Sequence, residues 1–250
     1  MQLSLPLPAA TPGAPVLLSL FDRSGVWSRP YALAGWLVIR VDSDYQPGIG
    51  LAPDGALNLG APIGTDGPGS FTPGSPLYRR LLSGRKVAGI LAAPPCKAFS
   101  KVGARHWKAM DADGRTAHGV ALACSTLEII ADLSPEFWAL ENPAGRLWNR
   151  RGTGLLQDRF SAPRFTFDPA DFALLADSPT SEAHRKYTQI WGSTSLAIPA
   201  SAPIPLLPRD HLPKSMRSRT QALAGKDWRT RAQTPQGFAR SFFAANSATV

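Results

Sequence analysis

The chain has 250 residues, of which 44% are hydrophobic, enough to build one full-sized core with a small appendage. Its formal net charge of +9 favours an anionic partner, and nucleic acid first. The only cysteines, Cys96 and Cys124, exclude a disulfide framework and a zinc site made of cysteines alone. The 22 glycines and 24 prolines indicate many turns without the excess that marks global disorder.

No apolar stretch approaches the roughly 20 residues of a membrane span. The first residues also lack the order of charged, apolar and small residues that marks a secretion signal. We therefore expect a cytoplasmic protein with no membrane partner. Residues 1–15 are rich in Pro and Ala and predict a flexible lead-in.

The first readable elements form a strand, a turn, a helix and a second strand. Residues 15–21 predict a buried strand, 22–28 a tight turn, 29–35 a helix and 36–41 a strand that ends at Asp42. A strand, a small-residue turn and a helix, followed by a strand with an acid about 20 positions on, are typical of half of a nucleoside-cofactor fold. In that pattern the acid binds the ribose hydroxyls.

The central part of the chain contains the most unusual stretch. Residues 43–76 hold few large apolar side chains and predict an extended loop, followed by a short helix over 77–82. Residues 87–93 then predict a buried strand that stops at Pro94 and Pro95, directly before Cys96. Cys96 is therefore expected at the carboxyl edge of a sheet, where open α/β sheets bind their ligands.

A second strand end with polar chemistry follows. After Cys96 we expect a basic loop as far as Asp113, and then a helix over 116–133 that carries Cys124 on its buried stripe. Residues 137–140 predict a strand that ends in Glu141, Asn142 and Pro143. The carboxylate would therefore lie at the same sheet edge as the thiol.

The last quarter of the chain is basic and rich in turns. Residues 187–191 predict a short strand, and 193–208 a connector. Residues 209–231 hold seven Lys or Arg against two Asp, a local charge of +5. Residues 234–243 predict a capped terminal helix with an apolar face. The four histidines have no metal-like spacing, so we expect no metal site.

A thiol and a carboxylic acid at neighbouring strand ends suit one particular reaction. Thiolate is the strongest nucleophile among the side chains at neutral pH. Cytosine is inert at its 5-position until a nucleophile adds at C6, and an acid that supports N3 eases that addition. Cys96 and Glu141 have the chemistry for these two tasks, and Asn142 can orient the glutamate or the base.

These residues resemble the motifs of the DNA cytosine-5 methyltransferases. The resemblance lies in residues 93–96 with Phe99 and Ser100, and in the Glu141-Asn142 pair. Phe21 with Gly25 is similar to the family's cofactor turn and Asp42 to its ribose-binding acid. Residues 234–246 are similar to its closing motif. The Glu-Asn-Pro variant and the short length are most like compact phage or prophage members, which implies a bacterial or phage-infected host cell.

The resemblance implies transfer of a methyl group from S-adenosyl-L-methionine to C5 of cytosine in double-stranded DNA, with the target base flipped out of the helix. It implies a Rossmann-like methyltransferase fold with a mostly parallel, doubly wound sheet, acting as a monomer. The catalytic domain would comprise 16–192 and 232–250, with a small basic recognition region over 193–231. The implied catalytic residues are Cys96, Glu141, Asn142 and Pro95. The implied cofactor-binding residues are Phe21, Asp22, Ser24, Gly25, Trp27, Asp42, Pro94 and Asn246. The implied DNA-binding residues are Lys97, Ser100, Lys101, Arg105, Arg185, Lys186, Arg217 and Arg219.

Three other functions compete with this interpretation. An amino-methyltransferase needs a hydrogen-bond acceptor before the prolines and an aromatic ring after them, but Ala93 and Cys96 stand there, so that class is excluded on chemistry. A basic DNA-binding protein on a decayed enzyme scaffold stays open, as does an enzyme that modifies pyrimidine nucleotides or already modified DNA. Taken alone, Cys96 and Cys124 would more often be small buried residues than nucleophiles.

Overall fold

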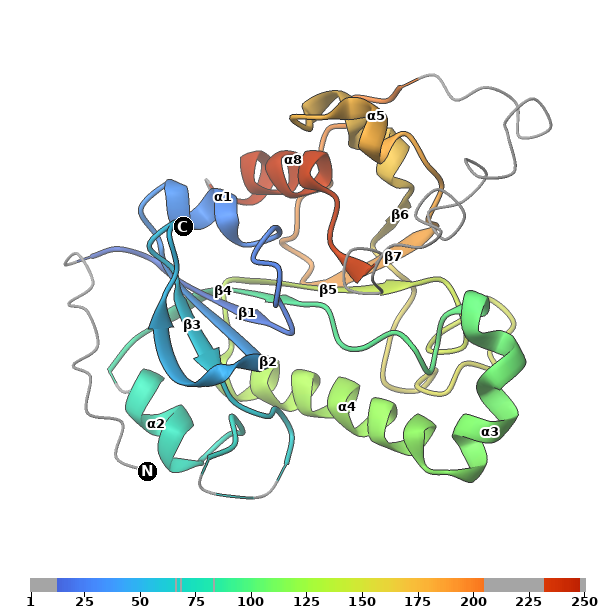
Figure 1. The fold of residues 1–250 in the computed structure, drawn as a ribbon, viewed down its shortest axis with the longest axis horizontal. Coiled ribbons are helices and arrows are strands. Elements are labelled where there is room, and N and C mark those ends of the chain that lie inside the picture. Colours follow the sequence, from blue (N-terminus) through green and yellow to red (C-terminus); the bar gives the residue numbers. More distant parts are fainter. Residues whose placement is uncertain (1–12, 66, 68, 83, 205–231, 248–250) are drawn as a thin grey trace.

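Seven strands form one sheet in the order β3-β2-β1-β4-β5-β7-β6 (Figure 1). The computed structural model describes residues 13–65, 67, 69–82, 84–204 and 232–247. Strands β1, β2, β4 and β5 run parallel, whereas β7 is antiparallel to both β5 and β6. The strands are β1 (Val16–Leu20), β2 (Leu37–Leu51), β3 (Leu57–Gly60), β4 (Val87–Ala92), β5 (Phe137–Pro143), β6 (Phe165–Phe167) and β7 (Thr188–Gly192).

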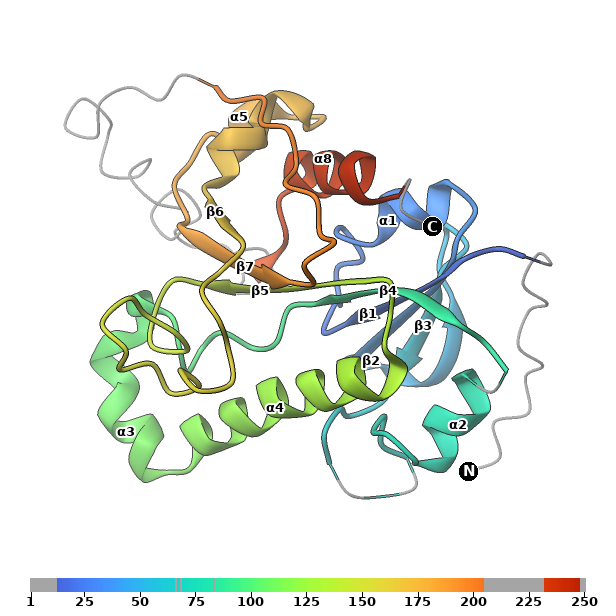
Figure 2. The same cartoon turned by 180° about the vertical axis from the view of Figure 1, so that it is seen from behind.

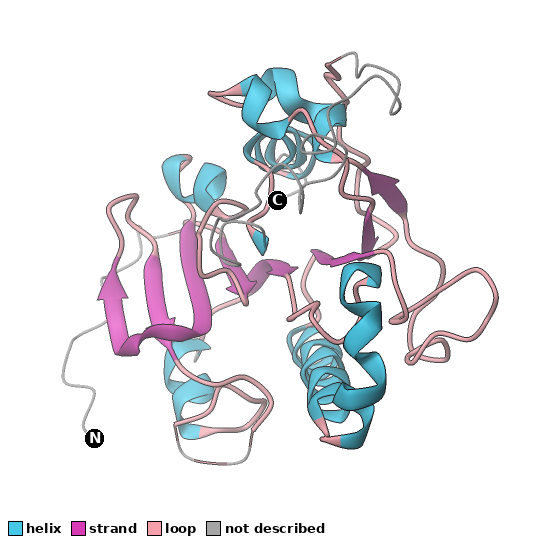
Figure 3. Ribbon diagram, turned by 45° about the vertical axis from the view of Figure 1, so that its right-hand side comes forward, coloured by secondary structure: helices cyan, strands magenta, loops and turns pink. Residues whose placement is uncertain are grey.

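Helices cover both faces of this sheet, which confirms the predicted Rossmann-like, doubly wound α/β fold (Figures 1 and 2). Helices α2 and α4 lie on one face, and α1 and α8 on the other (Figure 3 separates the two helical layers from the sheet). The α-helices are α1 (Arg29–Leu33), α2 (Pro76–Leu82), α3 (Trp107–Ala112), α4 (Arg115–Leu133), α5 (Pro179–Glu182) and α8 (Gln236–Asn246). Two 3-10 helices are η1 (Lys101–His106) and η2 (Pro169–Leu175).

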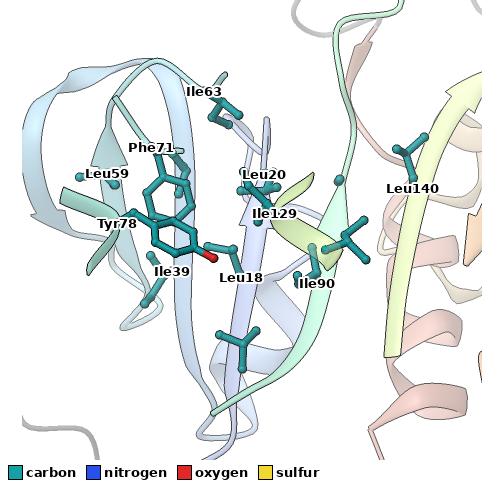
Figure 4. Packing of buried hydrophobic residues seen from close by; sticks show 14 of the residues in the cluster. Leu18, Leu20, Ile39, Leu59, Ile63, Phe71, Tyr78, Ile90, Ile129 and Leu140 are labelled. Carbon is teal, nitrogen blue, oxygen red and sulfur yellow. The ribbon is translucent and has the colours of Figure 1, made fainter. Parts of the chain in front are cut away.

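Alternation along the strands divides the core into two clusters. Leu18, Leu20 and Ile39 point to the face covered by α2 and α4 (Figure 4), whereas Leu17 and Val38 point to the other face. The second cluster is aromatic, with Phe238 of α8 stacked at 4.1 Å on Phe167 and packed against Trp27 and Phe172. Each such fully buried side chain contributes about 1.5–3 kcal/mol. Helix α8 is thereby fixed on this face of the sheet, although in sequence it follows residues 205–231, which lie outside the described part.

The prediction of an extended loop over 43–76 is wrong in its first part. Strand β2 continues to Leu51, and β3 follows at Leu57–Gly60. Ile39 pairs with Leu57 and Val41 with Leu59, but Ile49 pairs with Leu59 and Leu51 with Leu57, so β2 folds back along β3. A Cβ on Gly60 would lie 1.9 Å from the backbone oxygen of Gln46, so only glycine fits there. This structure depends on the pairing of β2 with β3 at the edge of the sheet. A Gly- and Pro-rich sequence carries no local signal for such pairing.

The segment after Cys96 also differs from the predicted loop. It folds into η1 and α3, and the Ser100 hydroxyl accepts a hydrogen bond from the Val102 N–H at 3.4 Å at the start of η1. The terminal helix is present as α8, but its N-terminus is capped from elsewhere in the chain. The Glu182 carboxylate accepts from the N–H of Gln236 and, at 3.0 Å, from that of Gly237.

Several predicted features lie wholly or partly outside the described residues. Residues 205–231, which include most of the predicted basic recognition region, are among them, as are residues 1–12 of the lead-in. Within the part of the chain that is described, no helix is long and apolar enough to cross a membrane. The same residues contain no group of three or more metal-ligating side chains placed to hold an ion.

Candidate active site

The ends of β4 and β5 meet at one edge of the sheet. Ala92, the last residue of β4, pairs with Leu140 of β5 in parallel register, so Glu141 is the next residue of β5 and Cys96 lies four residues beyond the end of β4. The Asn142 side-chain N–H donates to the Pro94 carbonyl at 3.0 Å, and Asn142 is fully buried. This bond ties the Pro-Pro turn to the end of β5 and fixes which end of the amide carries the nitrogen.

Lys186, which lies just before β7, forms an ion pair with the Glu141 carboxylate of β5. Its Nζ lies 3.4 Å from Glu141 Oε1, with side-chain exposures of 15% and 8%. Because β5 and β7 are antiparallel neighbours, the residues just before Thr188 come beside the end of β5, and the Ala144 N–H donates to the Tyr187 carbonyl at 2.9 Å. The carboxylate is thus buried beside a cation at the edge where the thiol lies.

The environment of Cys96 holds its thiol in the neutral form. Burial raises the pKa of the Cys96 thiol, the nearby Glu141 charge raises it further, and the Lys186 ammonium opposes both by lowering it. Both charged groups therefore act on the sulfur directly. A nucleophile here needs help to lose its proton, and of the two charged groups only Lys186 favours the thiolate.

The turn after β1 is held in an unusual backbone conformation. Phe21 has φ +59° and its N–H donates to the Val41 carbonyl at 2.8 Å, which places the turn beside the end of β2. The Asp22 carboxylate is buried and accepts hydrogen bonds from the hydroxyls of Ser19 at 2.9 Å and Ser28 at 2.6 Å. Asp22 therefore shapes the turn from inside.

A buried arginine supports this turn from β2. Arg40 is 3% exposed, and its Nε donates to the Ser28 hydroxyl at 2.8 Å. Its other nitrogens reach the Gly25 carbonyl at 3.4 Å and both carboxylate oxygens of Asp54, at 3.1 and 2.5 Å. A Cβ on Gly25, whose φ is +66°, would lie 2.7 Å from the Arg40 guanidinium carbon. We call Arg40, Ser28, Asp54, Asp22 and Gly25 the Arg40 network.

Asp42 lies where β2 begins to fold back along β3. It follows Val41, whose carbonyl accepts the hydrogen bond from the Phe21 N–H. Its carboxylate accepts from the Asp44 N–H at 2.8 Å, and burial raises its pKa above the ordinary aspartate value. The exposed Arg23 pairs with Asp44 at 3.0 Å, and the Tyr45 hydroxyl donates to the Asp22 carbonyl at 2.7 Å. A half-buried carboxylate beside an ordered turn fits the ribose diol of a nucleoside cofactor.

The structure places the other predicted residues in three groups. The exposed ones are Ser24, Pro95, Lys97, Lys101, Arg105 and Arg185. Ser100 is half-buried at the start of η1, and Pro94 is buried. Trp27 packs against Phe238 and Phe242, and the Asn246 side chain bonds the backbone of Ala197 at 2.9 and 3.2 Å. Trp27 and Asn246 make these contacts with the protein itself, and a cofactor role for either stays a prediction. Arg217 and Arg219 lie outside the described residues.

Sequence reasoning missed the residues that organise these turns. Arg40, Tyr45 and Arg146 had no predicted role, and for Asp54 none was predicted in shaping the turn. Only Arg40 carries a signal, because a charged residue within an otherwise apolar strand must find a partner when it is buried. The other three depend on which loops the fold brings together.

No protein-family model matches the sequence, and no curated protein matches it. Among solved structures, a prophage-encoded Escherichia coli protein assigned as a DNA modification methyltransferase matches with a TM-score of 0.43 and 15% identity. That match covers 84% of this chain, which spans 55% of the length of the Escherichia coli protein. A 16S rRNA (adenine(1408)-N(1))-methyltransferase from Catenulisporales acidiphilia matches with a TM-score of 0.34 and 15% identity, covering 79% of this chain and 92% of that one. Both likenesses are distant, and the fold assignment depends on the strand order of this chain.

Proposed function

We propose that this protein transfers a methyl group from S-adenosylmethionine to the 5-position of cytosine in DNA. The observation that carries the proposal is the placement of Cys96 and Glu141 at one sheet edge, with Lys186 paired to the carboxylate at 3.4 Å. Methyl transfer to cytosine C5 requires a nucleophile and an acid on one base. The pair supplies both.

The protein's own residues perform the steps around the transfer. Cys96 gives its proton to water and its sulfur bonds to C6, while Glu141, in its protonated form, donates its proton to N3 so that the ring electrons move toward C5. When bound, S-adenosylmethionine would supply the methyl group that C5 takes up, and its sulfonium would leave as a neutral thioether. After a base removes the C5 proton, the C5–C6 double bond forms again and the C6–sulfur bond breaks, returning the thiolate.

The cofactor would lie against the ends of β1 and β2. Asp42 would accept hydrogen bonds from the ribose hydroxyls, and the ordered turn from Phe21 to Gly25 would contact the methionine part. The raised pKa of Asp42 has a consequence for this contact. On acidification, the carboxylate becomes protonated at a higher pH than an ordinary aspartate, and we expect cofactor affinity to fall there.

DNA is the substrate we infer from charge and chemistry. Exposed basic side chains lie in the segment after Cys96 and before β7, namely Lys97, Lys101, Arg105 and Arg185. With the net charge of +9, they suit contacts to phosphates whose strength falls with added salt. A cytosine within a duplex must leave the stack before Cys96 can add to its C6.

Covalent trapping tests the proposal directly. DNA that contains 5-fluorocytosine cannot lose a proton from C5, so the enzyme should stay bonded to it in the presence of S-adenosylmethionine. Intact-mass measurement should show one adduct for the wild type and for Cys124→Ser, and none for Cys96→Ser. An absent wild-type adduct, with a known enzyme positive under the same conditions, would overturn the proposal.

One observation favours a second candidate, a DNA-binding protein on a decayed enzyme scaffold. The Arg23–Asp44 ion pair bridges the ends of β1 and β2, where the cofactor would bind. That candidate predicts salt-sensitive DNA binding without S-adenosylmethionine binding in calorimetry. If the cofactor does bind, mass spectrometry of digested DNA and of free nucleotides would separate action on DNA from action on nucleotides or on already modified DNA.

A further inference from the structure

We propose that Arg146 is a positioning residue that fixes the segment after Cys96 to the segment after Glu141. The proposal rests on the proposed function for its catalytic meaning, because it assigns the residue that keeps the nucleophile and the acid in register. Its structural part can be tested without any substrate.

Backbone contacts already bring the two segments together. The Arg146 N–H donates to the Phe99 carbonyl at 3.0 Å, and Ser100 and Gly145 form an isolated antiparallel bridge. A Cβ on Gly145 would lie only 1.9 Å from the Phe99 oxygen, so the close approach requires glycine. Residues three and four positions after the thiol thus lie against residues four and five positions after the acid.

The Arg146 side chain then joins three further parts of the chain. Its Nε donates to the Ala98 carbonyl at 2.7 Å, and its terminal nitrogens reach Asp111 at 2.8 Å and the Thr116 hydroxyl at 2.7 Å. The guanidinium also stacks over the Trp107 ring, with 4.6 Å from its carbon to the ring centroid. One side chain therefore holds the turn after Cys96, helix α3 and the start of α4.

Arginine is required for this set of contacts. Its planar group donates from several nitrogens at fixed angles while its face stacks on an aromatic ring, whereas a lysine ammonium is a single point charge. The Arg146 side chain is 14% exposed but Asp111 is 50% exposed, so the ion pair alone is weak. The bond to Ala98 and the stacking on Trp107 carry the positioning.

The positioning acts on the thiol through two residues of backbone. Cys96 is half-buried, and the N–H groups of Phe99 and Ser100 both donate to its carbonyl at 2.9 Å. If Ala98 and Phe99 lose their contacts with Arg146, this turn loses its outer support. The Cys96 sulfur then becomes accessible more often and is held less well against Glu141.

Alkylation in the protein without ligand tests this. Iodoacetamide would be applied to the wild type, Arg146→Met and Arg146→Lys, and modification of Cys96 and Cys124 measured by mass spectrometry in the same digest. Cys124, on α4, is the internal reference. We expect the Cys96 to Cys124 rate ratio to rise roughly tenfold in Arg146→Met through local opening. Arg146→Lys should give an intermediate rise.

Hydrogen exchange and a control variant complete the test. Amides of residues 98–112 should exchange faster in Arg146→Met, while those of β1 and β2 stay as in the wild type. Arg150→Met, at an exposed arginine of the same loop, should change neither measurement. If Arg146→Met does not fold, judged by its thermal transition, Arg146→Lys carries the comparison, together with Trp107→Leu, which removes the stacking. An unchanged alkylation ratio in a folded variant would overturn the proposal.

Turnover separates this proposal from the proposed function. With DNA saturating, Arg146→Lys should lower kcat while KM for S-adenosylmethionine stays unchanged, because the residue acts on the thiol side of the site. A fall in kcat together with a matching rise in that KM would contradict positioning of the thiol. A wild type that never traps DNA, but whose alkylation ratio depends on Arg146, would remove the proposed function and keep the structural role.

Discussion

Two pairs of strand ends form this site, and each is organised by one arginine in a different way. At the β1 and β2 ends, Arg40 lies inside the sheet layer, 3% exposed, and is paired with Asp54. At the β4 and β5 ends, Arg146 comes from a loop, and its acidic partner Asp111 is half exposed to solvent. A buried charge must keep its partner, whereas a charge at the surface can be solvated when contacts open.

The two arginines therefore affect different properties: Arg40 the stability of the fold, and Arg146 the position of the Cys96 thiol. Loss of Arg40 leaves Asp54 and the Ser28 hydroxyl without their donor beneath the turn, so the cost falls on folding itself. Loss of Arg146 frees a loop whose polar groups can reach water, so the cost falls on how the thiol is held. We therefore expect variants of the turn at the β1 and β2 ends to unfold the protein more easily. Variants of the loop at the β4 and β5 ends should instead leave the protein folded and hold the Cys96 thiol less firmly.

The largest stability effect is expected for Arg40→Met. Removing one partner of a buried ion pair should lower the free energy of unfolding by about 3 kcal/mol. The side chains of Arg40 and Asp54 are only 4% and 11% exposed. Urea denaturation would measure the loss, and the double variant Arg40→Met/Asp54→Leu should recover part of it, since no unpaired carboxylate remains. Lys86→Met is the control, because Lys86 is exposed and pairs with Glu136 at 2.6 Å. A loss no greater in Arg40→Met than in Lys86→Met would contradict the comparison.

A smaller effect is expected for Gly25→Ala. A non-glycine residue in the left-handed region costs about 1–2 kcal/mol, and Gly25 has φ +66° with the Arg40 guanidinium beneath it. The new Cβ must displace that group, so calorimetry should also show weaker S-adenosylmethionine binding than in the wild type. Gly35→Ala is the matched control, because Gly35 also has positive φ but nothing lies within 4 Å of a Cβ built there.

A third variant, remote from both arginines, provides the reference. Glu182 caps the N-terminus of α8, and Glu182→Gln should lower the free energy of unfolding by about 1 kcal/mol, since its carboxylate accepts from the N–H of Gln236 and Gly237. The Cys96 alkylation rate should stay at the wild-type value. A changed Cys96 alkylation rate in Glu182→Gln would mean that any loss of stability exposes the thiol. The effect of Arg146 substitutions would then not be specific to its contacts.

The last prediction concerns pH and leaves stability aside. Because burial raises the pKa of Cys96, its alkylation rate should still be climbing at a pH where the rate of a free cysteine has levelled off. Lys186→Met removes the charge that lowers this pKa and should move the profile to higher pH. Glu141→Gln removes a charge that raises it and should move the profile to lower pH. Shifts in the same direction for both variants would contradict the arrangement.

Much of the fold could be predicted because its signals are local. The buried runs before Phe21, Asp42, Cys96 and Glu141 are short and apolar, although β2 and β5 continue past Asp42 and Glu141, and α4 has helical spacing. The return arm of β2 and strand β3 gave no such signal, since their pairing depends on a Gly-rich edge. The helical structure of η1 and α3 was missed because its anchor, Arg146, lies 30 positions or more after them in sequence.

The sequence by itself determined strands β1, β4, β5 and β7, the first part of β2, helices α1, α2, α4 and α8, the thiol after two prolines and the acid near the end of the next strand. It could do so because apolar runs and proline stops are properties of neighbouring residues. Only the tertiary structure decided what surrounds them. Lys186 reaches Glu141 because β7 runs antiparallel to β5, and Arg40 and Arg146 find their partners in loops that are distant in sequence. These partners depend on long-range packing, because a charged side chain can pair with any oppositely charged or polar group that the fold places next to it.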